Sequence, residues 1–123
     1  MTFEKYCGIV SRLLERHWGV IDKDVIYKSY SREIGRIAGR ITLVDGSYID
    51  FAEEIIFVNR KMTKGRYRYQ YLKDVEIFRY DNYPKHPGIS FPFHHKHTST
   101  GVIQLEAAPK LIDIIEEALR QLF

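Results

Sequence analysis

The fold is decided by the stretch Arg66-Tyr67-Arg68-Tyr69-Gln70-Tyr71, in which tyrosines alternate strictly with polar residues. A period of two is typical of a β-strand with one buried face and one solvent-exposed face. Residues 75–80 return after a turn near Lys73-Asp74. An even-length loop there pairs Tyr67 with Tyr80, Tyr69 with Phe78, and Arg68 with Arg79. We expect an aromatic layer on one face and two neighbouring guanidinium groups on the other, with an acid such as Asp81 or a bound anion between them.

The chain on either side of this hairpin predicts two terminal helices and further strands. Apolar residues recur at helical spacing from Thr2 to about residue 16, and a second apolar stripe follows Pro109. Residues 20–31 have strand composition, and residues 36–43 alternate like a strand with one wet face. The expected architecture is α+β: a twisted antiparallel β-sheet of four to five strands, with the N-terminal and C-terminal helices packed on one face.

A second hairpin turns at Asp45-Gly46-Ser47, and the apolar pattern favours one register. A two-residue Asp-Gly loop pairs Ile41 with Asp50, whereas a three-residue bulged loop pairs Leu43 with Ile49, Ile41 with Phe51, and Ile37 with Ile55. We expect the bulged loop because it pairs apolar residues with one another. The strand then runs to Val58, followed by a basic connection over residues 59–65. Residues 98–104 are expected to form a short connection as well.

Composition restricts the class of protein. A length of 123 residues with 45% hydrophobic content is typical of a single domain, residues 1–123. No apolar run approaches the roughly 18 residues of a membrane span, and the N-terminus has no signal-peptide pattern, so we expect a cytoplasmic protein with no membrane partner. Cys7 is the only cysteine, which argues against an internal disulfide and a cysteine-based zinc site.

Positive charge is concentrated in one part of the chain. The net charge is +3, but residues 60–97 hold nine Lys and Arg residues against three acids. A basic surface attracts phosphate-bearing partners, or it serves only solubility. Four of the five histidines lie in the same region, which favours the first interpretation.

The histidines belong to a group of chemically versatile residues: Arg79-Tyr80-Asp81-Asn82, His86, and Phe91-Pro92-Phe93-His94-His95-Lys96-His97. Prolines at 84, 87 and 92 predict an irregular loop beside the sheet. If residues 93–97 are extended, His95 and His97 face one way while His94 and Lys96 face the other. We therefore expect His95 and His97 to be the active pair.

Three chemistries could use these residues. Imidazoles two residues apart on a strand can bind the same metal ion, and Asp81 or His86 could complete the set of ligands. However, no helical His-Glu-x-x-His pattern is present. Metal-independent RNA cleavage needs a base, an acid and fixed cations, all of which are found here. Nucleic-acid binding without catalysis would need only the basic hairpin. We favour metal-independent cleavage and expect no cofactor and no metal.

This hypothesis assigns a role to each candidate residue. The expected catalytic residues are His95, His97, Lys96 and Asp81. The expected substrate-binding residues are Arg68, Arg79, Asn82, His86, His94 and Tyr71.

The order of these motifs resembles the TumE family, small prokaryotic proteins regarded as toxin components of toxin–antitoxin systems. The resemblance covers roughly residues 36–119 and is carried by the tyrosine-arginine strand, the Arg79-Tyr80-Asp81-Asn82 motif, and the His94-His95-Lys96-His97 motif. Two features depart from the pattern: Lys85 stands where another histidine is expected, and Phe93 is an extra residue before the histidines.

The resemblance implies a growth-inhibiting protein that is neutralised by a cognate antitoxin, a helix-turn-helix DNA-binding protein encoded beside it. Many toxins of this size cleave RNA, so RNA as the substrate is an expectation by analogy. Exposed strands of a small sheet also permit a homodimer.

Overall fold

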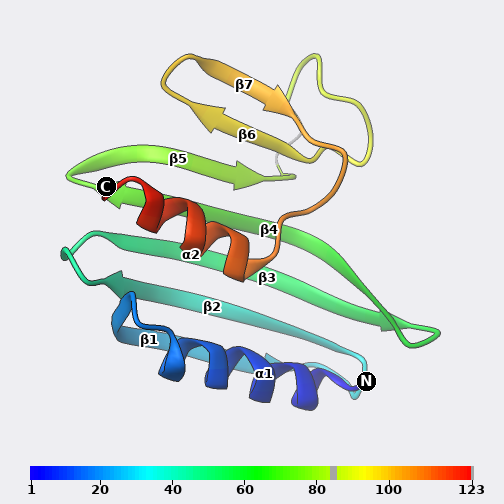
Figure 1. Ribbon diagram of the computed structural model, residues 1–123. Helices are drawn as coiled ribbons and strands as arrows, with labels where there is room; N and C mark the ends of the chain where they lie inside the picture. Colours follow the sequence, from blue (N-terminus) through cyan, green and yellow to red (C-terminus); the bar gives the residue numbers. More distant parts are fainter. Residues whose placement is uncertain (84–85, 123) are drawn as a thin grey trace.

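Each strand of the sheet pairs with the next strand in the sequence. The structure, a computed structural model, describes residues 1–83 and 86–122. These residues form one antiparallel sheet of seven strands in the order β1 to β7 (Figure 1). The elements are α1 (Phe3–Arg16), β1 (Val20–Ser29), β2 (Ile34–Leu43), β3 (Tyr48–Val58), β4 (Lys61–Lys73), β5 (Val75–Asp81), β6 (His95–Thr98), β7 (Gly101–Gln104) and α2 (Leu111–Arg120).

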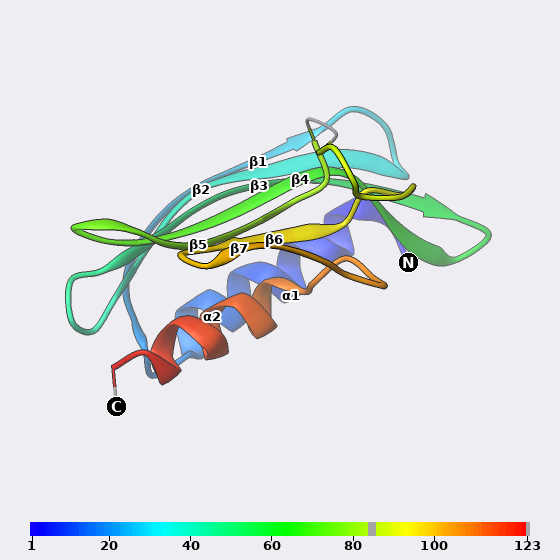
Figure 2. The ribbon, with the colours of Figure 1, turned by 90° about the horizontal axis from the view of Figure 1, so that it is seen from above.

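The α+β class and the position of both helices on one face are confirmed (Figure 2). The expected number of four to five strands is wrong, because two segments expected as connections are strands. Asn59 and Arg60 form a two-residue turn with φ of 50° and 66°, so β4 already begins at Lys61. Residues 98–104 contain the end of β6 and all of β7.

The turn between β2 and β3 differs from both expected registers. Ile41 pairs with Ile49, neither with Phe51 nor with Asp50. The loop consists of residues 44–46, with Gly46 at φ 86°, and the Leu43 amide donates to the Ser47 carbonyl at 2.8 Å. The Asp45 carboxylate accepts from the Ser47 amide at 3.0 Å, which holds Ser47 opposite Leu43 directly before β3 begins at Tyr48. The shift relative to the bulged loop is two residues, so every side chain keeps its predicted face.

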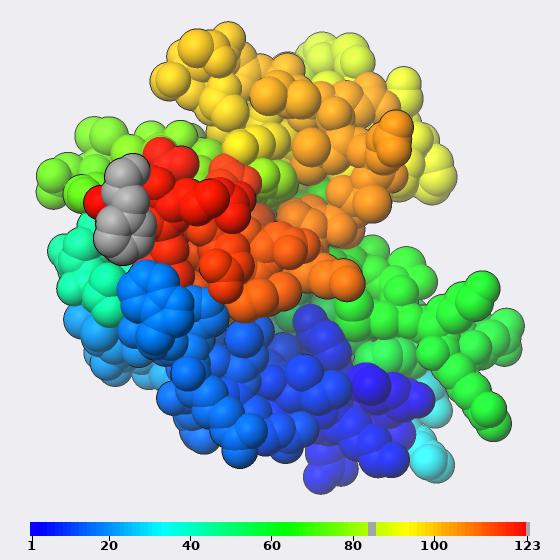
Figure 3. Space-filling view, viewed as in Figure 1, coloured from blue at the N-terminus to red at the C-terminus, as the bar shows by residue number. Residues whose placement is uncertain are grey.

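The core lies between the sheet and the two helices. The aromatic layer is confirmed: Tyr67, Tyr69, Tyr71 and Phe78 are all buried on the helix side. From α1 and α2 the buried contributions are Phe3, Val10, Leu14, Leu111, Ile114, Ile115, Ala118 and Leu119. The two helices lie next to one another (Figure 3), and His17 at the end of α1 contacts Glu116 of α2 at 3.0 Å. Neither helix in the described part of the chain is long and apolar enough to cross a membrane.

A charged residue lies at the centre of this core. Glu53 on β3 is fully buried and accepts hydrogen bonds from the hydroxyls of Tyr6 (2.8 Å) and Tyr69. The ammonium group of Lys64 on β4 lies 3.1 Å from the same carboxylate and donates to the Pro109 carbonyl at 2.6 Å. Burial raises the pKa of both tyrosine hydroxyls and lowers the pKa of Lys64, although Glu53 opposes the latter effect. We call Glu53, Lys64, Tyr6 and Tyr69 the Glu53 node.

Removing the cation of this node should destabilise the fold strongly. Lys64→Met leaves the Glu53 carboxylate buried without its counter-charge, and we expect the free energy of unfolding to fall by about 3–5 kcal/mol in urea denaturation. Lys61→Met on the same strand is the control, since Lys61 is exposed and its loss should change stability by less than about 0.5 kcal/mol. Equal effects of the two substitutions would contradict a structural role for the buried pair.

Candidate active site

Pairing between β5 and β6 brings together residues that lie fourteen or more positions apart in the sequence. Asp81 pairs with His95, and Arg79 pairs with His97. The alternate residues of β5, Phe78 and Tyr80, face the helices: Phe78 is buried in the core and the Tyr80 hydroxyl donates to Glu117 on α2. Arg79 and Asp81 therefore lie on the opposite face, which the helices leave open (Figure 2).

Asp81 is the centre of this group. One carboxylate oxygen, Oδ2, accepts from Arg79 Nε at 2.9 Å and lies 3.8 Å from His97 Nε2. The other, Oδ1, lies 2.6 Å from His95 Nε2. Asp81 is 3% exposed and His95 is 1% exposed, whereas the His97 side chain is 21% exposed. The carboxylate is thus buried, and the His97 imidazole connects it to solvent.

His86 completes the group from the loop after β5. Its ring centroid lies 5.7 Å from those of His95 and His97, which are 4.8 Å from one another. We call Asp81, His86, His95 and His97 the Asp81 cluster. Burial lowers the pKa of the His97 imidazole, and the positive charge of Arg79 acts in the same direction, while Asp81 opposes both.

Backbone carbonyls fix the orientation of two of these rings. His95 Nδ1 lies 2.6 Å from the Phe93 carbonyl, and His86 Nδ1 lies 2.9 Å from the Pro87 carbonyl. A carbonyl only accepts hydrogen bonds, so each Nδ1 carries a proton. In the neutral rings the lone pair is then on Nε2. For His95 this lone pair is on the nitrogen that faces Asp81.

The predicted alternation of the histidine segment is confirmed. His94 Nδ1 lies 2.9 Å from the buried Tyr67 hydroxyl, and Lys96 Nζ donates to Glu117 of α2 at 2.6 Å. Lys96 also lies over the rings of Phe78 and Tyr80. His94 and Lys96 thus face the helix side and lie apart from the Asp81 cluster.

The expected pairing of Arg68 with Arg79 is wrong. Arg68 pairs with Asp81, and Arg79 pairs with Gln70. The turn is tighter than expected because Asp74, at φ 64°, alone separates β4 from β5, and the register shifts between Tyr71 and Leu72. Both arginines still lie on the open face, since the shift moves each partner by two residues. Placing Arg68 beside a carboxylate also avoids the repulsion of a like-charged pair.

Two other predicted site residues are held within the fold. Tyr71 is fully buried, and its hydroxyl donates to Ser47 Oγ at 3.1 Å. The Asn82 side chain accepts from the Tyr67 amide at 3.0 Å and donates to the Gly65 carbonyl at 2.8 Å. Both side chains face partners inside the protein instead of the Asp81 cluster.

A basic hollow lies beside Arg68 on the open face. It has a volume of about 290 Å³ and is lined by Arg36, Ala52, Glu54, Arg66, Tyr67, Arg68 and Tyr83. The Arg66 guanidinium stacks on the exposed Tyr83 ring at 3.9 Å. Arg36 was not predicted as a site residue, because it comes from β2 and reaches this hollow only through the strand pairing.

A comparison with known protein families identifies the chain. The model of the family described as Toxin TumE matches residues 10–122, a range that contains the whole Asp81 cluster. The chain belongs to the toxin TumE family. No curated protein matches it, and neither does any solved structure. Membership in this toxin family implies an antitoxin as partner.

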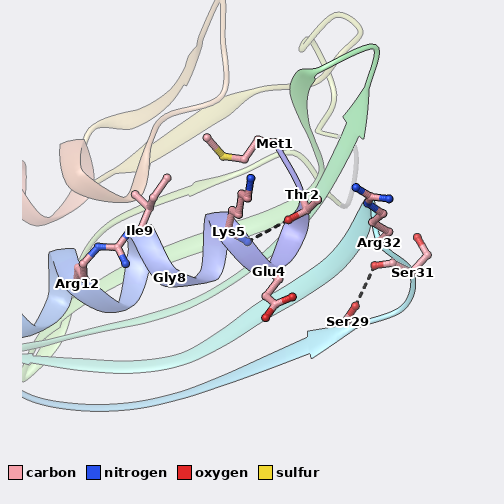
Figure 4. A pocket seen from close by; sticks show the side chains of 10 residues that line it. All are labelled: Met1, Thr2, Glu4, Lys5, Gly8, Ile9, Arg12, Ser29, Ser31 and Arg32. Atoms are coloured by element: carbon pink, nitrogen blue, oxygen red, sulfur yellow. Dashed lines mark hydrogen bonds between the residues drawn. The ribbon is translucent and has the colours of Figure 1, made fainter.

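A larger hollow of this TumE-family protein lies away from the cluster. It has a volume of about 940 Å³ and lies between α1 and the β1–β2 turn (Figure 4). Its charged lining residues are Glu4, Lys5, Arg12 and Arg32, and it contains no histidine. It therefore lacks a side chain that ordinarily titrates near neutral pH.

Of the two departures from the family pattern, Phe93 lies within the described residues and Lys85 does not. Phe93 lies in the described structure with φ of 71° and supplies the carbonyl that faces His95. Lys85 and Pro84 lie outside the described residues.

The buried position of Asp81 predicts a measurable contribution to stability in this TumE-family protein. Asp81→Asn removes the charge that binds the Arg79 guanidinium at 2.9 Å, and we expect the free energy of unfolding to fall by about 1–3 kcal/mol in urea denaturation. Glu76→Gln is the matched control, because Glu76 binds the same guanidinium at 3.1 Å but is exposed, and its loss should cost less than about 1 kcal/mol. A larger effect of Glu76→Gln would contradict the importance of the buried contact.

Proposed function

We propose that this member of the toxin TumE family inhibits growth by cleaving RNA, and that the reaction takes place at the Asp81 cluster. The observation that carries the proposal is the presence of three imidazoles, a buried carboxylate and a guanidinium on one open face of the sheet. Structural packing has little use for such a group, whereas proton transfer next to a phosphate requires these side-chain types.

The proposed reaction is an internal transesterification. The ribose 2′-oxygen attacks the neighbouring phosphorus atom, the bond from phosphorus to the 5′-oxygen breaks, and the products carry a 2′,3′-cyclic phosphate and a 5′-hydroxyl. A base takes the 2′-hydroxyl proton, and an acid returns a proton to the leaving 5′-oxygen. Imidazoles can move these protons directly, as expected from the sequence. A metal ion held by Asp81 and the histidines would instead supply a bound hydroxide as the base. The bonds made and broken are the same in both cases.

The arginines of the open face are suited to the phosphate. Arg79 is held beside Asp81 at 2.9 Å, and Arg68 is exposed next to the same residue in the strand register. Arg66 and Arg36 continue the positive surface away from the cluster. Guanidinium groups bind phosphate oxygens with paired hydrogen bonds, so an RNA backbone could follow this row. The exposed Tyr83 ring offers a surface on which an unpaired base can stack.

Cleavage of a labelled single-stranded RNA by the purified protein tests the proposal. We expect fragments with 2′,3′-cyclic phosphate ends, and no cleavage of DNA of the same sequence because it lacks the 2′-hydroxyl. His97→Gln should lower the rate by about 10²- to 10⁴-fold. His17→Gln is the control, since His17 lies at the end of α1 beside Glu116 and should leave the rate unchanged.

The same experiment separates the alternatives. Tight binding of RNA that stays intact would contradict an enzyme and favour a binding protein with a basic face. Cleavage that is lost in EDTA and restored by added metal would assign the proton transfers to a metal centre. Cleavage that persists in EDTA and still requires His97 would assign them to free imidazoles.

We further propose that the antitoxin implied by the family is a helix-turn-helix DNA-binding protein encoded next to this gene. Expression of the toxin alone should stop growth, and co-expression of the adjacent gene should restore it. Purification of a stable complex of the two products would support the assignment. An adjacent gene whose product neither binds the toxin nor restores growth would contradict it.

A further inference from the structure

We infer that Asp81, His95 and His97 form a binding site for a divalent transition-metal ion, with His86 placed to supply a fourth ligand. One potential ligand atom from each of Asp81, His95 and His97 lies within 4.8 Å of the others. This inference concerns binding alone and does not depend on whether the protein cleaves RNA. It departs from the expectation of no metal, which was based on the sequence.

The first argument is an unsatisfied acceptor. Asp81 Oδ1 is buried, and it accepts no hydrogen bond from any of the residues that the structure describes. His95 Nε2 lies only 2.6 Å away, but Nδ1 of that ring already carries the proton, so Nε2 is also an acceptor in the neutral ring. Two acceptors at this distance repel unless a cation lies between or beside them. A metal ion would accept both lone pairs.

The second argument is the orientation of the ligands by their neighbours. Metal-binding histidines usually donate the other ring N–H to a carbonyl or carboxylate, which fixes the ring and directs its lone pair. His95 does so to the Phe93 carbonyl and His86 to the Pro87 carbonyl. Arg79 holds Oδ2 of Asp81 at 2.9 Å and leaves Oδ1 free for the ion.

The third argument is the rigidity of the strands that carry the ligands. Asp81 and His95 are direct partners in adjacent strands, and His97 follows two residues later on the same face. This spacing places the three side chains side by side before any ion binds. The ligand set therefore depends on backbone hydrogen bonds of the sheet, with only His86 coming from a loop.

The donor set indicates the class of ion. Imidazole nitrogens with one carboxylate oxygen favour Zn²⁺ and related transition metals, whereas Mg²⁺ and Ca²⁺ prefer oxygen ligands alone. The partial exposure of His97 leaves a direction from which water or a phosphate oxygen can approach the ion. Such an open position is typical of catalytic metal centres.

Titration of the EDTA-treated and dialysed protein with Zn²⁺ tests the inference, with calorimetry as the readout and Co²⁺ absorption bands as a second signal. We expect one ion per chain and weak or no binding of Mg²⁺. Asp81→Asn and His97→Gln should each weaken Zn²⁺ binding by at least 10-fold, while circular dichroism monitors folding. His94→Gln is the matched control: it removes the neighbouring histidine, which faces Tyr67 on the other side, and should leave the affinity unchanged.

Two results would overturn the inference. The first is a folded wild-type protein that binds neither Zn²⁺ nor Co²⁺. The second is binding that persists at full affinity in both Asp81→Asn and His97→Gln, which would place the ion elsewhere. Because the titration contains no RNA, metal binding without RNA cleavage would refute only the proposed function and would support the site.

Discussion

The ion pair between Glu53 and Lys64 is the interaction on which the rest of the structure depends. It lies on the helix side of the two central strands, and its partners extend to Tyr6 in α1 and to the Pro109 carbonyl just before α2. A buried carboxylate is acceptable only when donors surround it. The node therefore fixes where both helices lie relative to the sheet, and the apolar residues around it then complete the core.

Strands β4 and β5 connect this core to the proposed site by simple alternation. On β4, Tyr67, Tyr69 and Tyr71 face the helices, while Arg66 and Arg68 face the open side. On β5, Asp81 follows directly after Tyr80, so the same backbone that docks against α2 also positions the carboxylate. Any displacement of α2 would thus be transmitted to the Asp81 cluster through one peptide unit. The Asp81 cluster therefore lies directly above packed core residues of the same strands.

From the sequence, the face of the sheet on which a side chain lies could be predicted better than the residue with which it pairs in the neighbouring strand. Both hairpin registers were wrong by two residues, and an error of that size leaves every side chain on its correct side. The separation of His95 and His97 from His94 and Lys96 could be predicted for the same reason. Strand β7 was missed because a four-residue segment carries too little alternation to be recognised. The alternation of β6 was predicted, but its pairing with β5 was not. Glu53 was missed because an acid within an apolar strand gives no signal of its buried cation, which comes from a segment expected to be a loop.

The sequential order of the strands has a consequence for the synthesis of this toxin. Because every strand pairs with its predecessor, the sheet can grow in the order in which the chain leaves the ribosome. His95 and His97 pair with a strand that is already present, but they are among the last residues of the sheet to be added. The helix α2, which covers the core behind them, is added later still. A nascent chain that has reached only β5 therefore carries Arg79 and Asp81 without their histidine partners, and the complete cluster forms only when β6 pairs with β5.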